Sequence, residues 1–113
     1  MSIQIAILVL IFIIKFMKLQ AKHIDIIKAF LKDKPVLKAY LFGSYVRGDA
    51  DEQSDIDILV ELDYSKHIGL GFIKIKQELE QKLNKKIDLV SSMAVSKYIL
   101  PFIDKEKLLI YEK

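Results

Sequence analysis

The sequence predicts a single α/β domain, a small mixed β-sheet with flanking helices. Its length of 113 residues allows one domain. Apolar residues make up 52% of the chain, which argues against a disordered protein. Segments with helical spacing of apolar residues alternate with short apolar runs typical of strands, without repeats or low-complexity linkers. Such an alternation is typical of one layered α/β fold.

Eight elements are expected along the chain. Helices are predicted from apolar residues at helical spacing, as at Ile24, Ile27 and Phe30. Pro35 ends the first helix, and Pro101 interrupts the last one, so we expect that helix to be short or broken. In chain order the expected elements are helix 19–31, strand 36–42, helical turn 45–48, strand 56–62, helix 70–83, strand 86–91, an interrupted helix 92–103 and strand 108–111.

Two acids stand at the start of the clearest strand, residues 56–62, whose even positions are all apolar. Residues two apart in a strand point to the same face. Asp55 and Asp57 are therefore expected to project side by side, while Ile56 and Ile58 enter the core. Close carboxylates repel each other unless one takes a proton or a cation lies between them. Mg²⁺ fits such a pair, because it binds one or two carboxylates together with phosphate oxygens.

Asp88 is the third candidate, in a strand otherwise suited to burial. A lone buried aspartate is costly unless it is paired, hydrogen-bonded or bound to metal. Read alone, Asp88 could face water at a sheet edge, and Asp55 could cap a turn after Ser54. Taken together, three aspartates on neighbouring strands predict a two-metal site for phosphoryl or nucleotidyl transfer. In that site Asp88 is the candidate to help deprotonate the nucleophile.

Composition narrows the chemistry of any metal site. The chain has no cysteine, so disulfides and thiolate metal sites are excluded, and a reducing, cytoplasmic location fits. Two isolated histidines, His23 and His67, leave little for a zinc site. Oxygen ligands therefore point to magnesium or manganese. The net charge of +3 gives no sign of a basic groove, so stable nucleic-acid binding is not expected.

A glycine-serine turn follows the strand at 36–42. Gly43 would allow backbone N–H groups to approach an anion closely, and the Ser44 hydroxyl adds a donor. Arg47 lies about one helical turn further on and could face the same phosphates. It is the only arginine beside seventeen lysines, which hints at a need for the planar guanidinium. Gly-Ser by itself is also an ordinary turn.

Together these residues resemble the signature of polymerase-β-like nucleotidyltransferases. That signature is Gly-Ser (Gly43-Ser44), ten residues, Asp-x-Asp (Asp55 and Asp57), and a third acid on a later strand (Asp88). The resemblance covers residues 17–113. Within the superfamily, the small size resembles the minimal nucleotidyltransferases, the MntA-type antitoxins of HEPN/MNT toxin–antitoxin systems.

The resemblance implies a nucleotidyltransferase fold and a protein adenylyltransferase activity. The enzyme would use two Mg²⁺ ions to transfer AMP from ATP to a tyrosine of a HEPN ribonuclease toxin. Asp55, Asp57 and Asp88 would be the catalytic and metal-binding residues, and Gly43, Ser44 and Arg47 would bind the nucleotide. The alternatives are a non-catalytic module that neutralises its partner by masking it, and a transferase for a small molecule. Nucleic-acid polymerisation is less favoured, because no template-binding domain is evident.

A partner chain is expected because the domain of residues 17–113 leaves no room for the helical domain that larger relatives add over the site. A hetero-oligomer follows, with contacts at positions such as Tyr64, Tyr98 and Phe102. The same side chains could equally be ordinary surface or packing residues.

Residues 1–16 are an apolar N-terminal extension without counterpart in the family. The run at residues 3–14 is shorter than the ~18–20 apolar residues a spanning helix needs, and it lacks the features of a signal peptide. A membrane anchor and an extra buried strand or helix are two interpretations. We favour a third, a natural start at Met17 that makes these sixteen residues dispensable.

Overall fold

The structure, a computed structural model, describes residues 2–113, including the side chains of all of these except residues 12–20. It is a mixed α/β fold, which confirms the predicted class. Its elements in chain order are α1 (Ile3–Leu31), β1 (Val36–Phe42), α2 (Ser44–Arg47), β2 (Ile56–Leu62), α3 (Gly71–Leu83), β3 (Ile87–Ser91), α4 (Leu100–Glu106) and β4 (Leu108–Glu112).

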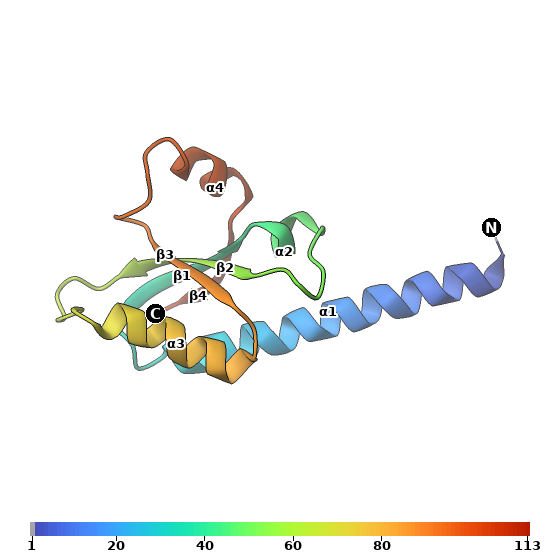
Figure 1. Cartoon of the computed structure of the whole chain (residues 1–113), viewed down its shortest axis with the longest axis horizontal. Helices are drawn as coiled ribbons and strands as arrows, with labels where there is room; N and C mark the ends of the chain where they lie inside the picture. Colours follow the sequence, from blue (N-terminus) through green and yellow to red (C-terminus); the bar gives the residue numbers. More distant parts are fainter. Residues whose placement is uncertain (1) are drawn as a thin grey trace.

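The four strands form one mixed sheet in the order β3-β2-β1-β4. β1 runs antiparallel to β2 and β4, whereas β2 and β3 are parallel. The parallel pair requires a crossover, which α3 provides. Figure 1 shows α3 and the C-terminal half of α1 on one face of the sheet and α4 on the other. The short α2 lies at the end of the sheet, next to β1 and β2.

The main core lies between the sheet and the helices α1 and α3. Its buried side chains include Ile27 and Leu31 of α1, Ile58 and Val60 of β2, and Leu79 of α3. The even positions of β2 are buried there, as the alternation predicted. On the opposite face, two further residues, Leu59 of β2 and Ile103 of α4, are buried outside this cluster. The odd-numbered face of β2 is therefore only partly covered, and Asp57 lies on it.

Two helices differ from the expectation. The first helix begins at Ile3 rather than near residue 19, so the apolar extension continues straight into it. The last helix does not span residues 92–103 but runs from Leu100 to Glu106, with Pro101 in its first turn. Proline is tolerated there because the first-turn N–H groups have no partner inside the helix. Pro101 therefore begins this helix instead of breaking it.

The N-terminal half of α1 projects beyond the sheet (Figure 1). Its described side chains are exposed, from 79% at Ile3 to 44% at Ile11. Met1 and the side chains of residues 12–16 lie outside the described part of the chain. Within the described residues, no helix has the length and apolar character needed to span a membrane.

We propose that residues 1–16 are dispensable for folding. A chain that starts at Met17 should change the free energy of unfolding by less than about 0.5 kcal/mol, as is usual for exposed positions. The reason is that, among the side chains of α1 that the structure describes, the first one buried in the core is Ile27. Thermal denaturation followed by circular dichroism measures this. Loss of the cooperative transition in the shortened chain would refute the proposal.

Candidate active site

Asp57 and Asp88 face each other on neighbouring strands. They are register partners in the parallel β2–β3 pair. Asp57 is flanked by the buried Ile56 and Ile58, so its side chain points away from the main core. Asp88 lies between the buried residues Ile87 and Leu89 of β3 and is itself exposed. Both carboxyl groups therefore lie on the same, partly open face of the sheet, as the sequence predicted.

The carboxyl of Asp57 has a raised pKa and therefore holds its proton more tightly than an ordinary aspartate. Burial raises its pKa from 3.8 to about 6, and the negative charge of Asp88, a hydrogen bond with Asp88 and the charge of Asp55 add to the effect. The positive charge of Arg47 acts in the opposite direction. Like charges are thus held close together in the metal-free protein. A divalent cation would remove this repulsion, and carboxylate oxygens are the ligands that Mg²⁺ prefers.

Asp55 lies beside this pair rather than within it. It precedes β2, whose pairing with β3 begins at Ile56, and its side chain is 41% exposed. Its nearest cation is Lys86, with 4.0 Å between Nζ and Oδ2. In the described part of the chain, no three His, Cys, Asp or Glu side chains are grouped so as to hold a metal ion. The structure brings two of the three predicted acids together, and Asp55 contributes as a nearby charge.

Gly43 positions the candidate phosphate loop directly against Asp57. It follows β1, where Phe42 is the register partner of Asp57, and it ends the strand with φ 78° and ψ −151°. A Cβ atom added at Gly43 would collide with Oδ2 of Asp57. Only glycine combines this backbone conformation with so close an approach. Ser44, the first residue of α2, follows at once.

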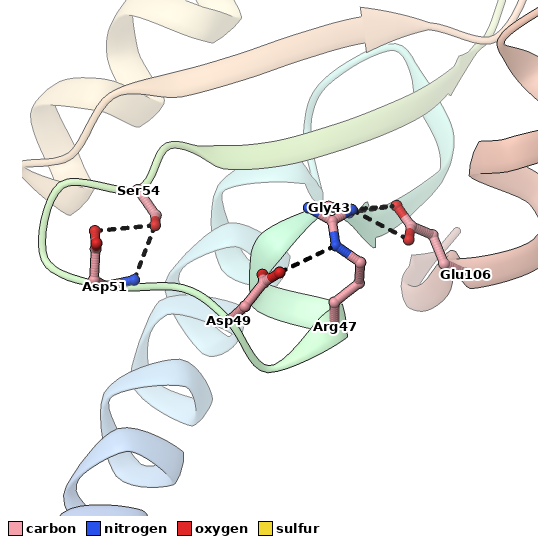
Figure 2. Close-up of polar contacts among 6 residues, drawn as sticks. All are labelled: Gly43, Arg47, Asp49, Asp51, Ser54 and Glu106. Atoms are coloured by element: carbon pink, nitrogen blue, oxygen red, sulfur yellow. Dashed lines mark hydrogen bonds and ion pairs between the residues drawn. The ribbon is translucent and has the colours of Figure 1, made fainter.

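Arg47 is held at the same turn by two acids (Figure 2). Its Nη1 donates to Glu106, at 3.2 Å to Oε1 and 3.3 Å to Oε2, and its Nε lies 3.5 Å from Oδ2 of Asp49. The Gly43 N–H also donates to Oε1 of Glu106, at 2.9 Å. The hydrogen bond with Glu106, followed by the charge of Asp49, raises the pKa of Arg47 above its ordinary value. Arg47 therefore remains a cation at the turn.

Sequence reasoning missed Glu106. No motif marks it, because it is one of fifteen acids and stands in the last turn of a short helix. Glu106 reaches the turn through the pairing of β1 with β4, and no sequence pattern indicates that pairing.

The loop before β2 is ordered locally, since Ser54 Oγ accepts from the Asp51 N–H at 2.9 Å (Figure 2).

The raised pKa of Asp57 predicts a pH-dependent stability of the metal-free protein. Because folded Asp57 keeps its proton to a higher pH than the unfolded chain does, the contribution of Asp57 to the free energy of unfolding should fall as pH rises from about 4 to about 6. Asp57→Asn removes the effect. In a chelator at pH 7, this variant should be more stable by about 1 kcal/mol after allowance for solvent screening, or roughly 5 °C in Tm. Below about pH 4 the gain should disappear.

The control for this prediction is Asp33→Asn, which removes a carboxylate that is 80% exposed. It should shift Tm by less than about 2 °C at either pH, as exposed positions usually do. An Asp57→Asn variant with no higher Tm than the wild type at pH 7 would show that Asp57 is not under charge repulsion.

Comparison with known proteins gives the family. Residues 25–113 match the family described as polymerase beta, nucleotidyltransferase. A Methanocaldococcus jannaschii protein with the provisional name protein adenylyltransferase is 39% identical over 88 residues, which cover 74% of this chain and 85% of the relative. The protein adenylyltransferase MntA of Thermococcus cleftensis is 39% identical over 66 residues, covering 58% of this chain and 66% of MntA.

A solved structure supports the same assignment. It is described as a toxin–antitoxin with AMP-PNP, and it matches with a TM-score of 0.65 and 25% identity over 75% of this chain and 69% of its own. Residues 25–113, which match the family, contain the sheet, the glycine-serine turn and the paired aspartates. The family match over most of the chain and the identity to the archaeal relatives agree with the predicted signature. This protein therefore belongs to the polymerase β nucleotidyltransferase family.

Proposed function

We propose that this nucleotidyltransferase transfers AMP from Mg²⁺-bound ATP to a tyrosine of a HEPN-type ribonuclease and so acts as its antitoxin. The observation that carries the proposal is the convergence of Asp57 and Asp88 beside the Gly43 turn. The names of the relatives, protein adenylyltransferases, support the choice of AMP and of a protein acceptor. The similar toxin–antitoxin structure with AMP-PNP supports the antitoxin role.

The reaction needs a nucleophile, a site that binds the phosphates and a group that accepts the proton of the attacking hydroxyl. The tyrosine oxygen attacks the α-phosphorus, a new P–O bond forms, and the bond to the bridging oxygen breaks to release pyrophosphate. Mg²⁺ held by Asp57 and Asp88, with Asp55 nearby, would neutralise the phosphates and lower the pKa of the attacking hydroxyl. Asp88, the more exposed of the pair, is placed to help remove the tyrosine proton.

The glycine-serine turn supplies donors for the triphosphate. The absence of a Cβ at Gly43 keeps the backbone close to the Asp57 carboxylate, so phosphates bound at the turn would lie beside the metal ligands. Arg47 is half-exposed and cationic, which suits a charge-assisted hydrogen bond to a phosphate oxygen. The Ser44 hydroxyl is the neutral donor at the same place.

The partner is proposed to close the open face of the sheet. The predicted contact residues Tyr64, Tyr98 and Phe102 are all exposed, and α4, which carries Phe102, lies on the face of the sheet that bears the site (Figure 1). Tyr98 and Phe102 belong to the segment that leads into α4 and to α4 itself. Exposed aromatic side chains are typical of protein interfaces. Such a surface supports a hetero-oligomer with the HEPN-type protein.

The test is label transfer to the purified HEPN-type partner in the presence of Mg²⁺. ATP labelled at the α-phosphate should label the partner, whereas ATP labelled at the γ-phosphate should not, because pyrophosphate is released. Mass spectrometry then identifies the modified residue. Transfer of the γ-label instead would mean a kinase and would sink the proposal. A modified residue other than tyrosine would correct the acceptor.

Masking is the second candidate function, and the exposed Tyr98 and Phe102 favour it. The two functions separate in the Asp57→Asn variant, which should still fold and bind. If this variant no longer neutralises the partner's ribonuclease activity, transfer is required. If it neutralises as well as the wild-type protein, binding alone accounts for the antitoxin effect.

A further inference from the structure

The junction of α4 and β4 meets the phosphate loop because of strand pairing. β4 pairs with β1 such that Leu108 lies opposite Leu41 and Leu109 opposite Tyr40. Continuing this register by two residues places Glu106 opposite Gly43. α4 ends at Glu106, where the N–H of the following residue donates back to Ile103 O at 2.8 Å. The last side chain of α4 therefore lies at the turn whose N–H and hydroxyl groups are proposed to donate hydrogen bonds to the phosphates.

One carboxylate there engages both parts of the loop. Oε1 of Glu106 accepts from the Gly43 N–H and from Nη1 of Arg47, and Oε2 accepts from the same nitrogen (Figure 2). The Glu106 side chain is only 26% exposed, whereas that of Arg47 is 52% exposed. Charge-assisted hydrogen bonds of this kind are stronger than neutral ones and fix geometry. Glu106 therefore joins the backbone of the turn to the one guanidinium beside it.

The contacts leave Arg47 able to bind a ligand. The guanidinium has five N–H donors, and the described contacts use Nε and Nη1. Within the described part of the chain, no hydrogen bond or ion pair engages Nη2. Glu106 thus restrains the arginine from one side and leaves the other side for an anion. Side chains held in this way bind with a smaller loss of conformational entropy.

We propose that Glu106 is a positioning residue, which orients Arg47 and the Gly43 turn for the phosphates of the nucleotide. The inference rests on the proposed function in one respect, that this loop binds a nucleoside triphosphate. The opposite role would be competition, in which the carboxylate blocks Arg47 and phosphate must displace it. The two roles differ in sign: loss of Glu106 weakens nucleotide binding under positioning and strengthens it under competition.

The test measures the Kd of Mg²⁺·AMP-PNP by calorimetry, which needs no acceptor protein. Glu106→Ala should weaken binding about tenfold, because both hydrogen-bond partners are released. Glu106→Gln keeps an acceptor for the Gly43 N–H and loses the charge, so a weakening of about threefold is expected. The matched control is Asp104→Asn, which removes the same charge from the same helix. Asp104 pairs with Lys107 at 2.8 Å, and its variant should bind within twofold of wild type.

A double-mutant cycle separates positioning from general stability. In an Arg47→Ala background, Glu106→Ala should weaken binding further by only about threefold instead of tenfold, because only the contact with the Gly43 N–H is left to lose. The ¹H–¹⁵N resonance of the Gly43 amide should shift in both Glu106 variants and not in Asp104→Asn. Should Glu106→Ala fail to fold, Glu106→Gln and the Gly43 resonance decide the matter.

Each outcome has a separate meaning for the two proposals. Unchanged or tighter AMP-PNP binding in the Glu106 variants overturns the positioning role, as does a fully additive cycle. A wild-type protein that binds AMP-PNP but transfers no label to its partner overturns the proposed function alone. A wild-type protein that does not bind AMP-PNP overturns both.

Discussion

AMP transfer should fall by about 10³-fold or more when Asp57 is replaced by asparagine, the order expected when a group that stabilises developing charge is removed. Asp57 is half-buried, faces Asp88 across the parallel strand pair, and touches the space that a Cβ of Gly43 would occupy. An amide keeps the shape of the side chain but supplies no negative charge to a divalent cation. Initial rates with α-labelled ATP and the HEPN-type partner measure the effect.

The stability of the same variant excludes unfolding as the cause. Asp57→Asn removes a carboxylate whose pKa is raised to about 6 by burial and by its acidic neighbours, so the metal-free variant should be more stable at pH 7 than the wild type. Loss of activity together with a gain in Tm is the signature of a functional acid. Asp33→Asn, at an exposed position, should retain full activity. Retention of more than a tenth of wild-type activity in Asp57→Asn would rule out the proposed role.

Gly43→Ala should abolish transfer and destabilise the fold by about 2–3 kcal/mol. Two causes add up. The backbone has φ 78° and ψ −151°, a region open essentially to glycine. The new Cβ would also collide with the Asp57 carboxylate, so either the turn or the aspartate must move. Urea denaturation measures the stability, and AMP-PNP calorimetry measures the loss of nucleotide binding.

Gly48→Ala is the matched control for this prediction. Gly48 caps α2 with φ 83° and ψ 12°, and among the described residues, its chain neighbours aside, no heavy atom lies within 4 Å of an added Cβ. The left-handed conformation alone should cost about 1 kcal/mol, with activity retained within a few fold. Equal losses in the two variants would mean that the Gly43 effect comes from backbone strain and not from the approach to Asp57.

Local pattern predicted the centre of the fold well. The strands at 36–42 and 56–62 have the predicted bounds, because short apolar runs with period-two alternation leave little choice of structure. The same alternation correctly assigned Asp57 to the face opposite the core. The face of Asp88 followed from the neighbouring apolar residues in the same way.

Local pattern failed where more than one structure satisfied it. A run that is apolar on nearly all sides shows no separate apolar and polar faces. Nothing in residues 3–14 therefore indicated that α1 would begin at Ile3 and extend away from the sheet. The segment before Pro101 has apolar residues that allow a helix, yet the helix forms only after it. The position of Asp55 just before the first paired residue of β2, with an ion pair to Lys86 at 4.0 Å, was likewise not evident from local pattern.

The family, the glycine-serine turn and the acids of the site could be identified from the amino-acid sequence, because they depend on residue type and on short spacing along the chain. Which of these acids meet, and which residue holds the turn, became known from the three-dimensional fold. Asp57 meets Asp88 through the register of β2 with β3, and Glu106 meets Gly43 through the register of β1 with β4. Strand register arises from the packing of the whole sheet against its helices, so contacts that depend on it cannot be inferred from neighbouring residues alone.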